Sequence, residues 1–514
     1  MLSIIKSMSL LGLNGYLISV EVDVSAGLPC FEIVGLPDTS IRESKERVQT
    51  AIRNSGIPLL SKKIIVNLSP ANIRKEGSMF DLPMAVGVLI ATGNIKNDDL
   101  EKLLVDTVFI GELSLNGTLN KISGILPICI EAKRMGIKQI VLPIENAKEA
   151  SIINGLKILP ARTLTDVISY LNNQLEIIPE QNSSVSSQVI INHDVDFSDV
   201  RGQDNVKRAM EISAAGGHNC LLIGSPGSGK TMISRRLPTI LPDMTFEESL
   251  EVTKIHSIAG ILSDNTPLII QRPFRHPHHT ISGISLVGGG KIPKPGEISL
   301  SHYGVLYFDE LPEFNKNTLE TLRGPLEDKE ITISRVNASI TYPCNFMFIA
   351  SMNPCPCGYY GSAEKSCNCT PEQIKKYISK ISGPLLDRID LHIEVSPVKY
   401  ENFDNSKKEL DSKTIKARVN QARKIQQLRY KDFGIFSNSE LTPKLIERFC
   451  ILNSSSKNIL NAAFNSLGLS ARAYSRILKV ARTIADLDNS DNIEVQHLTE
   501  ALQYRSLDRK YWGN

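Results

Sequence analysis

The stretch of sequence that decides the fold is Gly224-Ser225-Pro226-Gly227-Ser228-Gly229-Lys230-Thr231. The apolar run 220–223 before it is typical of a buried parallel strand, and residues 232–237 after it can start a helix. In this setting the spacing forms a P-loop, whose backbone N–H groups and helix N-terminus hold phosphate. Lys230 would reach the β- and γ-phosphates, and the Thr231 hydroxyl would ligate Mg²⁺. The stretch therefore predicts a site for ATP and Mg²⁺; the alternative is a glycine-rich turn that matches by chance.

The composition favours a soluble protein of several domains. With 514 residues the chain is too long for one core, and its formal charge of +3 argues neither for nor against nucleic acid. A run of about eighteen apolar residues and a cleavable leader are both lacking, so we expect no contact with a membrane. The nine cysteines do not form a secreted disulfide framework. We therefore expect a cytoplasmic protein.

Two polar stretches divide the chain. Residues 174–196 are rich in serine and carry a proline, as a linker does, and a second polar run at 402–413 precedes helical patterns. We therefore predict an α/β N-terminal domain at 1–173, a P-loop α/β domain with a parallel sheet at 197–400, and a helical C-terminal lid at 401–514.

Two carboxylates and an amide follow later apolar strands. Asp309 and Glu310 end the run 304–308, where Asp309 would hold Mg²⁺ and Glu310 would polarise the attacking water. Asn353 follows the strand-like run 346–350 and can place its amide beside the γ-phosphate. The alternatives are a strand end with solvated acids and a turn-forming asparagine before proline.

Three further stretches complete a pattern that resembles a known family. They are Arg272-Pro273-Phe274-Arg275-His276-Pro277-His278-His279-Thr280-Ile281-Ser282, Met352-Asn353-Pro354-Cys355-Pro356-Cys357-Gly358 and Leu469-Ser470-Ala471-Arg472-Ala473. With Asp309-Glu310 and 385–390 they resemble the ComM/YifB family of Mg-chelatase-like AAA+ ATPases, in the clade that also holds the MCM replicative helicases. The resemblance spans essentially the whole chain.

The resemblance assigns three more site residues. Asn353 would be the first sensor, Arg388 the arginine finger that acts on the ATP of the neighbouring subunit, and Arg472 the second sensor. A finger acting in trans stabilises the charge that builds on the γ-phosphoryl oxygens. It implies a homo-oligomeric ring, by resemblance a hexamer. Without the family match, a salt bridge from Arg388 to Asp387 or Asp390 would be the simpler interpretation.

The N-terminal region resembles another family. Residues 132–146 are similar to the end of a Lon-protease catalytic domain, which cleaves peptides with a Ser–Lys dyad. Where the serine would stand, this chain has Phe80-Asp81-Leu82-Pro83-Met84, and Asn120 falls where the lysine is expected, although Lys121 is adjacent. Without a hydroxyl nucleophile the dyad cannot operate. We therefore expect a proteolytically inactive Lon-like fold that binds DNA or a protein partner.

Four cysteines follow the predicted sensor strand within fifteen residues. They are Cys355, Cys357, Cys367 and Cys369. Four thiolates satisfy tetrahedral Zn²⁺, although the C-x-C spacing is tighter than the usual C-x₂-C. We therefore predict a structural zinc site, with free thiols in a reducing compartment as the alternative. The histidines of 272–282 are further ligand candidates, but their arginine- and proline-rich setting favours a structural or DNA-facing loop.

Two basic hairpins could line the pore of a ring. They are 286–295, a glycine-rich tip, and 328–341, two alternating strands. By resemblance they match the helix-2 insert and the pre-sensor hairpin that touch single-stranded DNA in the MCM clade. The candidate phosphate contacts are Lys291, Lys294, Lys329 and Arg335. The alternative is that these are solvated loop charges.

These features together predict an ATP-driven ring that moves on single-stranded or branched DNA. The resemblance implies a branch-migration helicase acting in recombination during natural transformation. The alternative is a Mg-chelatase motor subunit that remodels a protein partner, against which the Lon-like domain and the cysteines argue. A nucleotide-gated scaffold without turnover is disfavoured by Lys230, Glu310 and Arg388.

Overall fold

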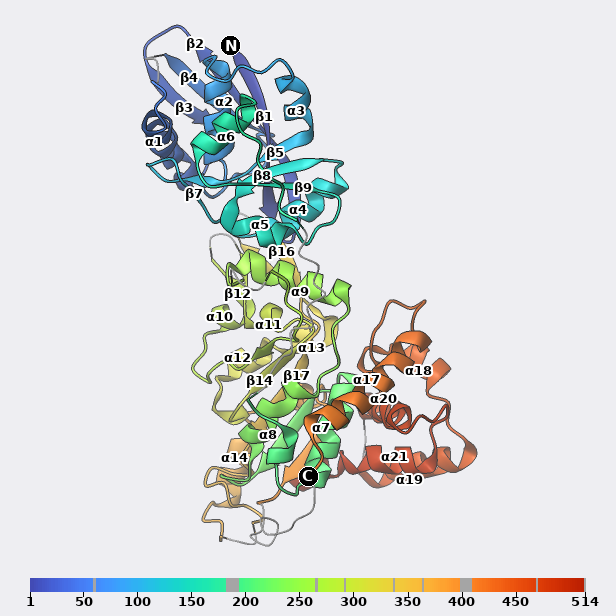
Figure 1. Cartoon of the computed structure of the whole chain (residues 1–514). Helices are drawn as coiled ribbons and strands as arrows, with labels where there is room; N and C mark the ends of the chain where they lie inside the picture. The colour runs from blue at the N-terminus through green and yellow to red at the C-terminus, as the bar shows by residue number, and fades with distance from the viewer. Residues whose placement is uncertain are drawn as a thin grey trace. The chain divides into compact units, whose positions relative to one another are not determined.

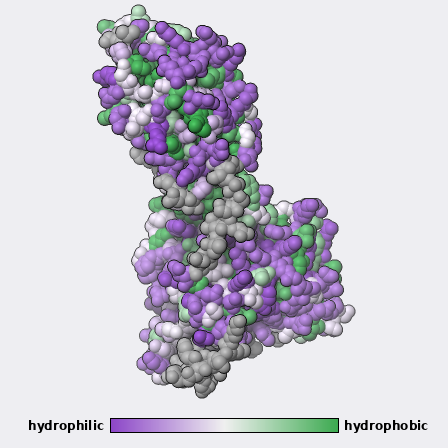
Figure 2. All heavy atoms as spheres, viewed as in Figure 1, coloured by the Kyte–Doolittle hydropathy of each residue, from purple (hydrophilic) through white to green (hydrophobic). Residues whose placement is uncertain are grey.

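The computed structural model describes residues 1–58, 62–181, 194–263, 267–290, 293–335, 338–362, 365–397, 409–467 and 470–512. The chain divides into two compact units, Met1–Val189 with Ser249–Ile269, and Ile190–Glu248 with Ile270–Asn514. Figure 2 shows mainly hydrophilic residues on the visible face of each unit. None of the described helices is long and apolar enough to span a membrane.

The first unit is built on a four-stranded sheet in the order β1-β2-β4-β3 (Figure 1). Its strands are β1 (Leu2–Leu11), β2 (Asn14–Ser25), β3 (Cys30–Val34) and β4 (Lys63–Ser69). Smaller sheets pair β5 (Thr107–Phe109), β8 (Gln139–Pro143) and β9 (Lys157–Ala161), and β6 (Glu112–Leu113) with β7 (Leu119–Asn120). The helices are α1 (Thr39–Asn54), α2 (Asp81–Ala91), α3 (Leu100–Asp106), α4 (Ile125–Arg134), α5 (Ala147–Ala150) and α6 (Leu164–Leu171). Helix α2 is buried along its whole length, because ten of its eleven residues are uncharged and mostly apolar.

Residues 249–269 belong to the first unit, although they follow the P-loop in the sequence. They contain most of helix α9 (Phe246–Ala259). The carbonyl of Ser257 accepts a 3.1 Å hydrogen bond from the Gly124 N–H, and its hydroxyl donates to the buried Glu149. A short excursion from the P-loop part of the chain therefore completes the first unit.

The second unit contains a five-stranded parallel sheet in the order β11-β14-β17-β10-β18. Its strands are β10 (Cys220–Gly224), β11 (Phe274–Arg275), β14 (Val305–Phe308), β17 (Met347–Met352) and β18 (Leu391–Val395). Two hairpins are formed by β12 (Gly288–Gly289) with β13 (Lys294–Pro295), and by β15 (Glu330–Arg335) with β16 (Ala338–Pro343). The α-helices before the lid are α7 (Asp204–Gly216), α8 (Lys230–Arg236), α10 (Gly283–Val287), α11 (Glu297–Leu300), α12 (Lys316–Glu320), α13 (Arg323–Asp328), α14 (Pro371–Ile378) and α15 (Gly383–Leu386). Strands β10, β14 and β17 are fully buried, which explains their continuous apolar sequences.

The end of the chain is helical, as predicted. Its helices are α17 (Ser412–Arg429), α18 (Pro443–Phe449), α19 (Ser454–Leu467), α20 (Ala471–Leu487), α21 (Val495–Gln503) and α22 (Ser506–Trp512). Apolar residues of α17 and α20 join the same core as the sheet. The predicted fold class, an α/β core with a parallel sheet and a helical C-terminal part, is confirmed.

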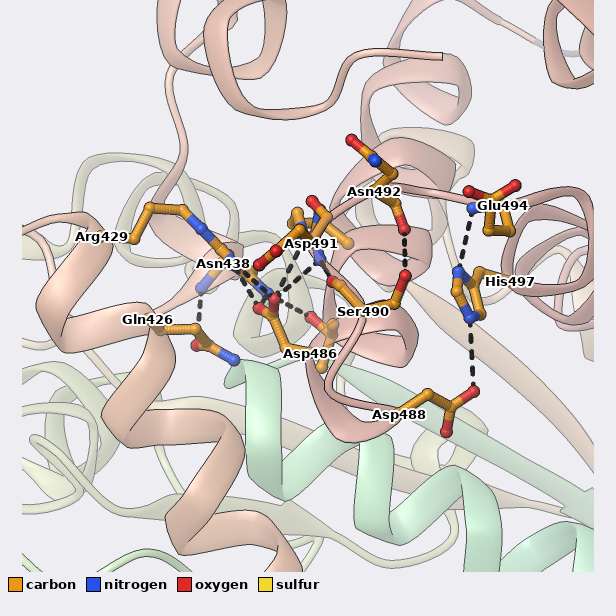
Figure 3. A network of polar contacts seen from close by, with 12 residues as sticks. Gln426, Arg429, Asn438, Asp486, Asp488, Ser490, Asp491, Asn492, Glu494 and His497 are labelled. Atoms are coloured by element: carbon orange, nitrogen blue, oxygen red, sulfur yellow. Dashed lines mark hydrogen bonds and ion pairs between the residues drawn. The ribbon is translucent and has the colours of Figure 1, made fainter. Parts of the chain in front are cut away.

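A buried acid joins three segments of this helical part (Figure 3). Asp486 of α20 accepts hydrogen bonds from both Arg429 Nη atoms at 2.6 and 3.0 Å, and one from Asn438 Nδ2 at 2.8 Å. Arg482 donates to the same carboxylate at 3.1 Å. Asp486 and Arg482 are both buried, and the carboxylate compensates the charge of Arg482 as well as that of Arg429.

Asp486→Ala is expected to destabilise the second unit by about 3–5 kcal/mol, because two arginines would lose their buried partner. Asp488→Ala is the matched control: that side chain is 42% exposed, and its contacts with His497 and Arg208 measure 3.4 and 3.5 Å, so its loss should cost less than about 1 kcal/mol. Urea denaturation followed by circular dichroism compares the two. Equal midpoints for both variants would contradict this account.

Candidate nucleotide site

The P-loop lies between β10 and α8, as the sequence predicts. Gly229 adopts a left-handed backbone with φ of 91° directly before Lys230, the first residue of α8. Gly227 is also left-handed, with φ of 77°, and glycine adopts this conformation without steric cost. The two glycines therefore let the loop turn directly into the N-terminus of α8, where a phosphate-binding loop places its backbone N–H groups.

Lys230 is held at the mouth of this loop. Its Nζ donates to the carbonyl oxygens of Gly224 and Ser225 at 2.8 and 2.9 Å, and to Asn353 Oδ1 at 3.2 Å. Burial lowers the pKa of the ammonium, while the nearby Asp309 and Glu310 carboxylates oppose that shift. Asn353 directly follows β17, so two neighbouring parallel strands bring the predicted lysine and the predicted sensor together.

Thr231 and Asp309 also meet. The Thr231 hydroxyl donates to Asp309 Oδ2 at 2.8 Å, and the Ser351 hydroxyl donates to Oδ1 of the same carboxylate. Burial raises the pKa of Asp309, but these hydroxyl hydrogen bonds outweigh it and hold the pKa below its usual value. A hydroxyl beside an ionised carboxylate suits Mg²⁺, which prefers hard oxygen ligands. Sequence reasoning missed Ser351, whose only signal was its place on the strand that leads to Asn353.

Glu310 stands next to this pair with its side chain exposed. Its backbone is left-handed, with φ of 54°, and its N–H donates to Asp309 Oδ1 at 3.1 Å. A non-glycine residue seldom adopts this conformation, and such strain is common at functional sites. The turn separates the two carboxylates, so that one meets Thr231 and the other is free to contact water.

Arg388 lies near the amino ends of the parallel strands, whereas the P-loop follows the carboxyl end of β10. Arg388 precedes β18, and its carbonyl accepts a 2.8 Å hydrogen bond from the side chain of Asn219, which precedes β10. The P-loop follows the other end of β10, a strand of five residues or about 16 Å. Arg388 is therefore too far away to contact a nucleotide held by Lys230 of the same subunit.

The partners of Arg388 differ from those considered in the sequence. Its guanidinium pairs with Glu327 and donates to the Pro384 carbonyl at 2.7 Å, while Asp390 pairs with Arg476. Among the described residues, the buried Nε of Arg388 has no hydrogen-bond partner. The guanidinium thus keeps unused donor capacity.

Arg472 lies on the same side of the molecule as Arg388. Both arginines line a cavity of about 620 Å³, together with Lys329, Arg476 and Lys479 of the same unit. The side chain of Arg472 is exposed. The structure therefore brings the predicted finger and the predicted second sensor together, away from Lys230.

The two predicted hairpins pack against each other. Tyr342 of β16 donates to the Pro293 carbonyl at 2.8 Å, and the Arg335 guanidinium lies against Gly289. Lys294 and Arg335 are exposed. Arg275 of β11 donates to Glu297, which follows the first hairpin, at 2.6 and 2.7 Å. Lys291 lies outside the described residues.

Lys329 is not at a hairpin tip. It precedes β15, where its carbonyl accepts from the Cys344 N–H, and its side chain lines the cavity of Arg388. Burial lowers the pKa of its ammonium. The structure therefore places Lys329 beside Arg388 and not at the hairpin tip, and its contact with DNA stays a prediction.

The four cysteines form one cluster, which we call the knuckle (355–362 and 365–369). All four Sγ atoms lie within 4.8 Å of one another. The Sγ of Cys355 is 3.3 Å from that of Cys357 and 3.7 Å from that of Cys367. The predicted zinc ligands are therefore at the separations that one tetrahedral metal ion requires.

In the first unit, the positions of the Lon-type dyad have other partners. Asp81 is buried and pairs with Arg47 at 2.7 Å, and Asn120 Nδ2 donates to Glu112 at 3.0 Å. A carboxylate held in an ion pair does not replace an activated serine. Both positions thus take part in structural polar contacts.

In the sheet, β17 lies between the P-loop strand β10 and the acidic strand β14. This order, with the P-loop, the Asp309–Glu310 pair and a helical lid, defines an ATPase of the AAA+ class. Residues 196–403 match the family described as magnesium chelatase, subunit ChlI, residues 20–146 match subunit ChlI of Mg-chelatase, and residues 409–505 match the ChlI C-terminal family.

Full-length relatives narrow the class to a family. The chain is 44% identical over 512 residues to "Uncharacterized protein YifB" of Escherichia coli, covering 99% of this chain and 98% of that protein. It is 41% identical over 515 residues to "Competence protein ComM" of Haemophilus influenzae, with the same coverage of 99% and 98%. A shorter match to Lon protease 2 of Bacillus subtilis is 29% identical over 183 residues and covers 32% of each chain. The chain belongs to the ComM/YifB family of Mg-chelatase-like AAA+ ATPases.

Proposed function

We propose that this protein is an ATP-driven ring, by resemblance a hexamer, that moves along branched or single-stranded DNA. The observation that carries this proposal is the placing of two sets of residues. Four of them meet at the carboxyl ends of the parallel strands, namely Lys230, Thr231, Asp309 and Asn353. Arg388 lies at the amino ends of the same strands. One subunit then supplies the triphosphate site and its neighbour supplies the finger. On assembly the Arg388 guanidinium exchanges Glu327 for the γ-phosphate, and Arg472 approaches the same nucleotide.

The packed hairpins supply the DNA contact. Lys294 and Arg335 are exposed and cationic. Lys291, which lies outside the described residues, is a further candidate from its sequence alone. Such contacts bind phosphates whatever the sequence. ATP turnover around the ring would move these hairpins past successive phosphates.

The relative that is named a competence protein supports a role in competence. We propose branch migration during natural transformation, in the cytoplasm, with the Lon-like unit at 1–173 binding DNA or a partner and the P-loop core at 197–400 followed by its lid at 401–514. The matches to magnesium chelatase subunits favour one alternative, an ATPase that remodels a protein partner. That alternative predicts turnover that does not respond to DNA.

The hairpins can be tested by replacing both exposed cations. Lys294→Ala combined with Arg335→Ala should weaken binding of fluorescent single-stranded DNA in the presence of a slowly hydrolysed ATP analogue. The slope of log K against log salt should fall in magnitude by about 0.7 for each lost phosphate contact. Lys444→Ala, which removes an exposed lysine of α18, is the control. Unchanged affinity and slope in the double variant would remove the hairpins from the DNA path.

We also propose that the knuckle binds one structural Zn²⁺. Metal analysis of the purified chain should find about one zinc per subunit, because four thiolates form a closed tetrahedral site. Cys367→Ser should lose the metal, whereas Cys30→Ser, at a cysteine of β3, should keep it. Zinc-free protein that still carries four reduced knuckle thiols would contradict the proposal.

A further inference from the structure

The knuckle is joined to the phosphate site through Asn353. Cys355, which is fully buried, follows this sensor by two residues. The Asn353 side chain accepts a 3.2 Å hydrogen bond from Lys230 Nζ. Asn353 therefore links the start of the cysteine segment to Lys230.

A second contact joins the knuckle to the P-loop itself. Gly358 has φ of 86°, and a Cβ placed there would lie 2.4 Å from Cδ and 2.6 Å from Cγ of Pro226. Real Cβ atoms do not approach other atoms so closely, so the knuckle backbone rests directly on the phosphate loop. Gly358 is the residue type that this approach requires.

The space beside this contact is open. A cavity of about 310 Å³ is bordered by Gly224 and Ser225 of the P-loop on one side, and by Pro354, Gly358 and Tyr360 on the other. On its side facing the knuckle, the P-loop is thus supported by the contact of Pro226 with Gly358, next to a cavity. The position of Gly358 then matters for the shape of the loop.

We infer that the zinc-loaded knuckle is a brace for the nucleotide site. Tetrahedral coordination fixes Cys355 and Cys357, these fix Asn353 and Gly358, and the latter two position Lys230 and Pro226. ATP affinity then depends on metal occupancy, since a relaxed knuckle releases both supports. This inference rests on the zinc proposed above.

The first test leaves all four thiols in place. Gly358→Ala should keep its zinc but weaken binding of a fluorescent ATP analogue by about tenfold, because the new methyl group displaces Pro226. Gly361→Ala is the matched control: its φ is 74°, yet a Cβ there meets only Lys510 Nζ, at 3.9 Å. This variant should keep both zinc and affinity. In a Pro226→Ala background, which removes the colliding atoms, Gly358→Ala should cause little further loss.

The second test removes the metal from the unmodified chain. Chelation should release one zinc and weaken nucleotide binding, and re-addition of zinc should restore it. Wild-type affinity in zinc-containing Gly358→Ala, or in chelated protein, would overturn the brace and leave the zinc site standing. Absence of zinc from the wild-type protein would overturn both the metal site and the brace.

Discussion

Arg388→Ala is expected to lower ATP turnover by about 10³- to 10⁵-fold, the range of an arginine finger in phosphoryl transfer. The guanidinium neutralises charge that develops on the γ-phosphoryl oxygens, and the structure leaves its Nε without a partner among the described residues. ATP binding should change little, because Arg388 lies across the sheet from Lys230 of its own chain. Steady-state hydrolysis and equilibrium binding of a fluorescent analogue measure the two effects.

Mixed rings test whether Arg388 acts in trans. A Lys230→Ala subunit cannot hold ATP but still offers an intact Arg388, whereas an Arg388→Ala subunit has the reverse defect. Co-assembled, some interfaces pair an intact P-loop with an intact finger, so mixtures of the two inactive variants should recover turnover. Mixtures as inactive as their components would contradict a finger in trans. Arg388→Lys, which keeps the charge but not the planar fork, should recover only part of the rate.

Glu310→Gln is expected to lower turnover by about 10²- to 10⁴-fold, as loss of a general base does. The exposed side chain of Glu310 stands beside the Asp309–Thr231 pair, so the amide should leave ATP and Mg²⁺ binding intact. Glu313→Gln is the matched control, since that carboxylate is 45% exposed and forms a surface ion pair with Lys380 Nζ at 3.6 Å. Rapid-quench measurement of ATP hydrolysis, together with equilibrium binding of ATP, separates the hydrolysis step from nucleotide binding. Normal turnover in Glu310→Gln would remove the residue from its role.

Local motifs in the sequence were enough to select the residues that meet around the P-loop. Asp309 and Asn353 directly follow apolar strands, and Lys230 and Thr231 begin the helix after the P-loop. Parallel strands bring such ends together. The cysteine cluster was equally accessible, because its four members lie within fifteen residues.

Contacts between segments that are distant in the sequence could not be predicted from local motifs. Glu327, the partner of Arg388, is 61 residues away in the sequence, and Arg472 reaches the same cavity only through packing of α20. Lys329 was assigned to a hairpin surface because strand alternation does not show which way the residue before a strand points. The excursion at 249–269 joins the first unit through Ser257, for which the sequence holds no local signal.

The central claim is that ATP hydrolysis drives this protein along DNA. The most direct measurement is strand displacement from a synthetic branched junction by the full-length protein, with ATP hydrolysis recorded in the same reaction. The account predicts that the junction stimulates turnover, and that strands separate with ATP but not with a non-hydrolysable analogue or with Glu310→Gln. Vigorous ATP hydrolysis that is unaffected by DNA, without strand separation, would contradict the claim.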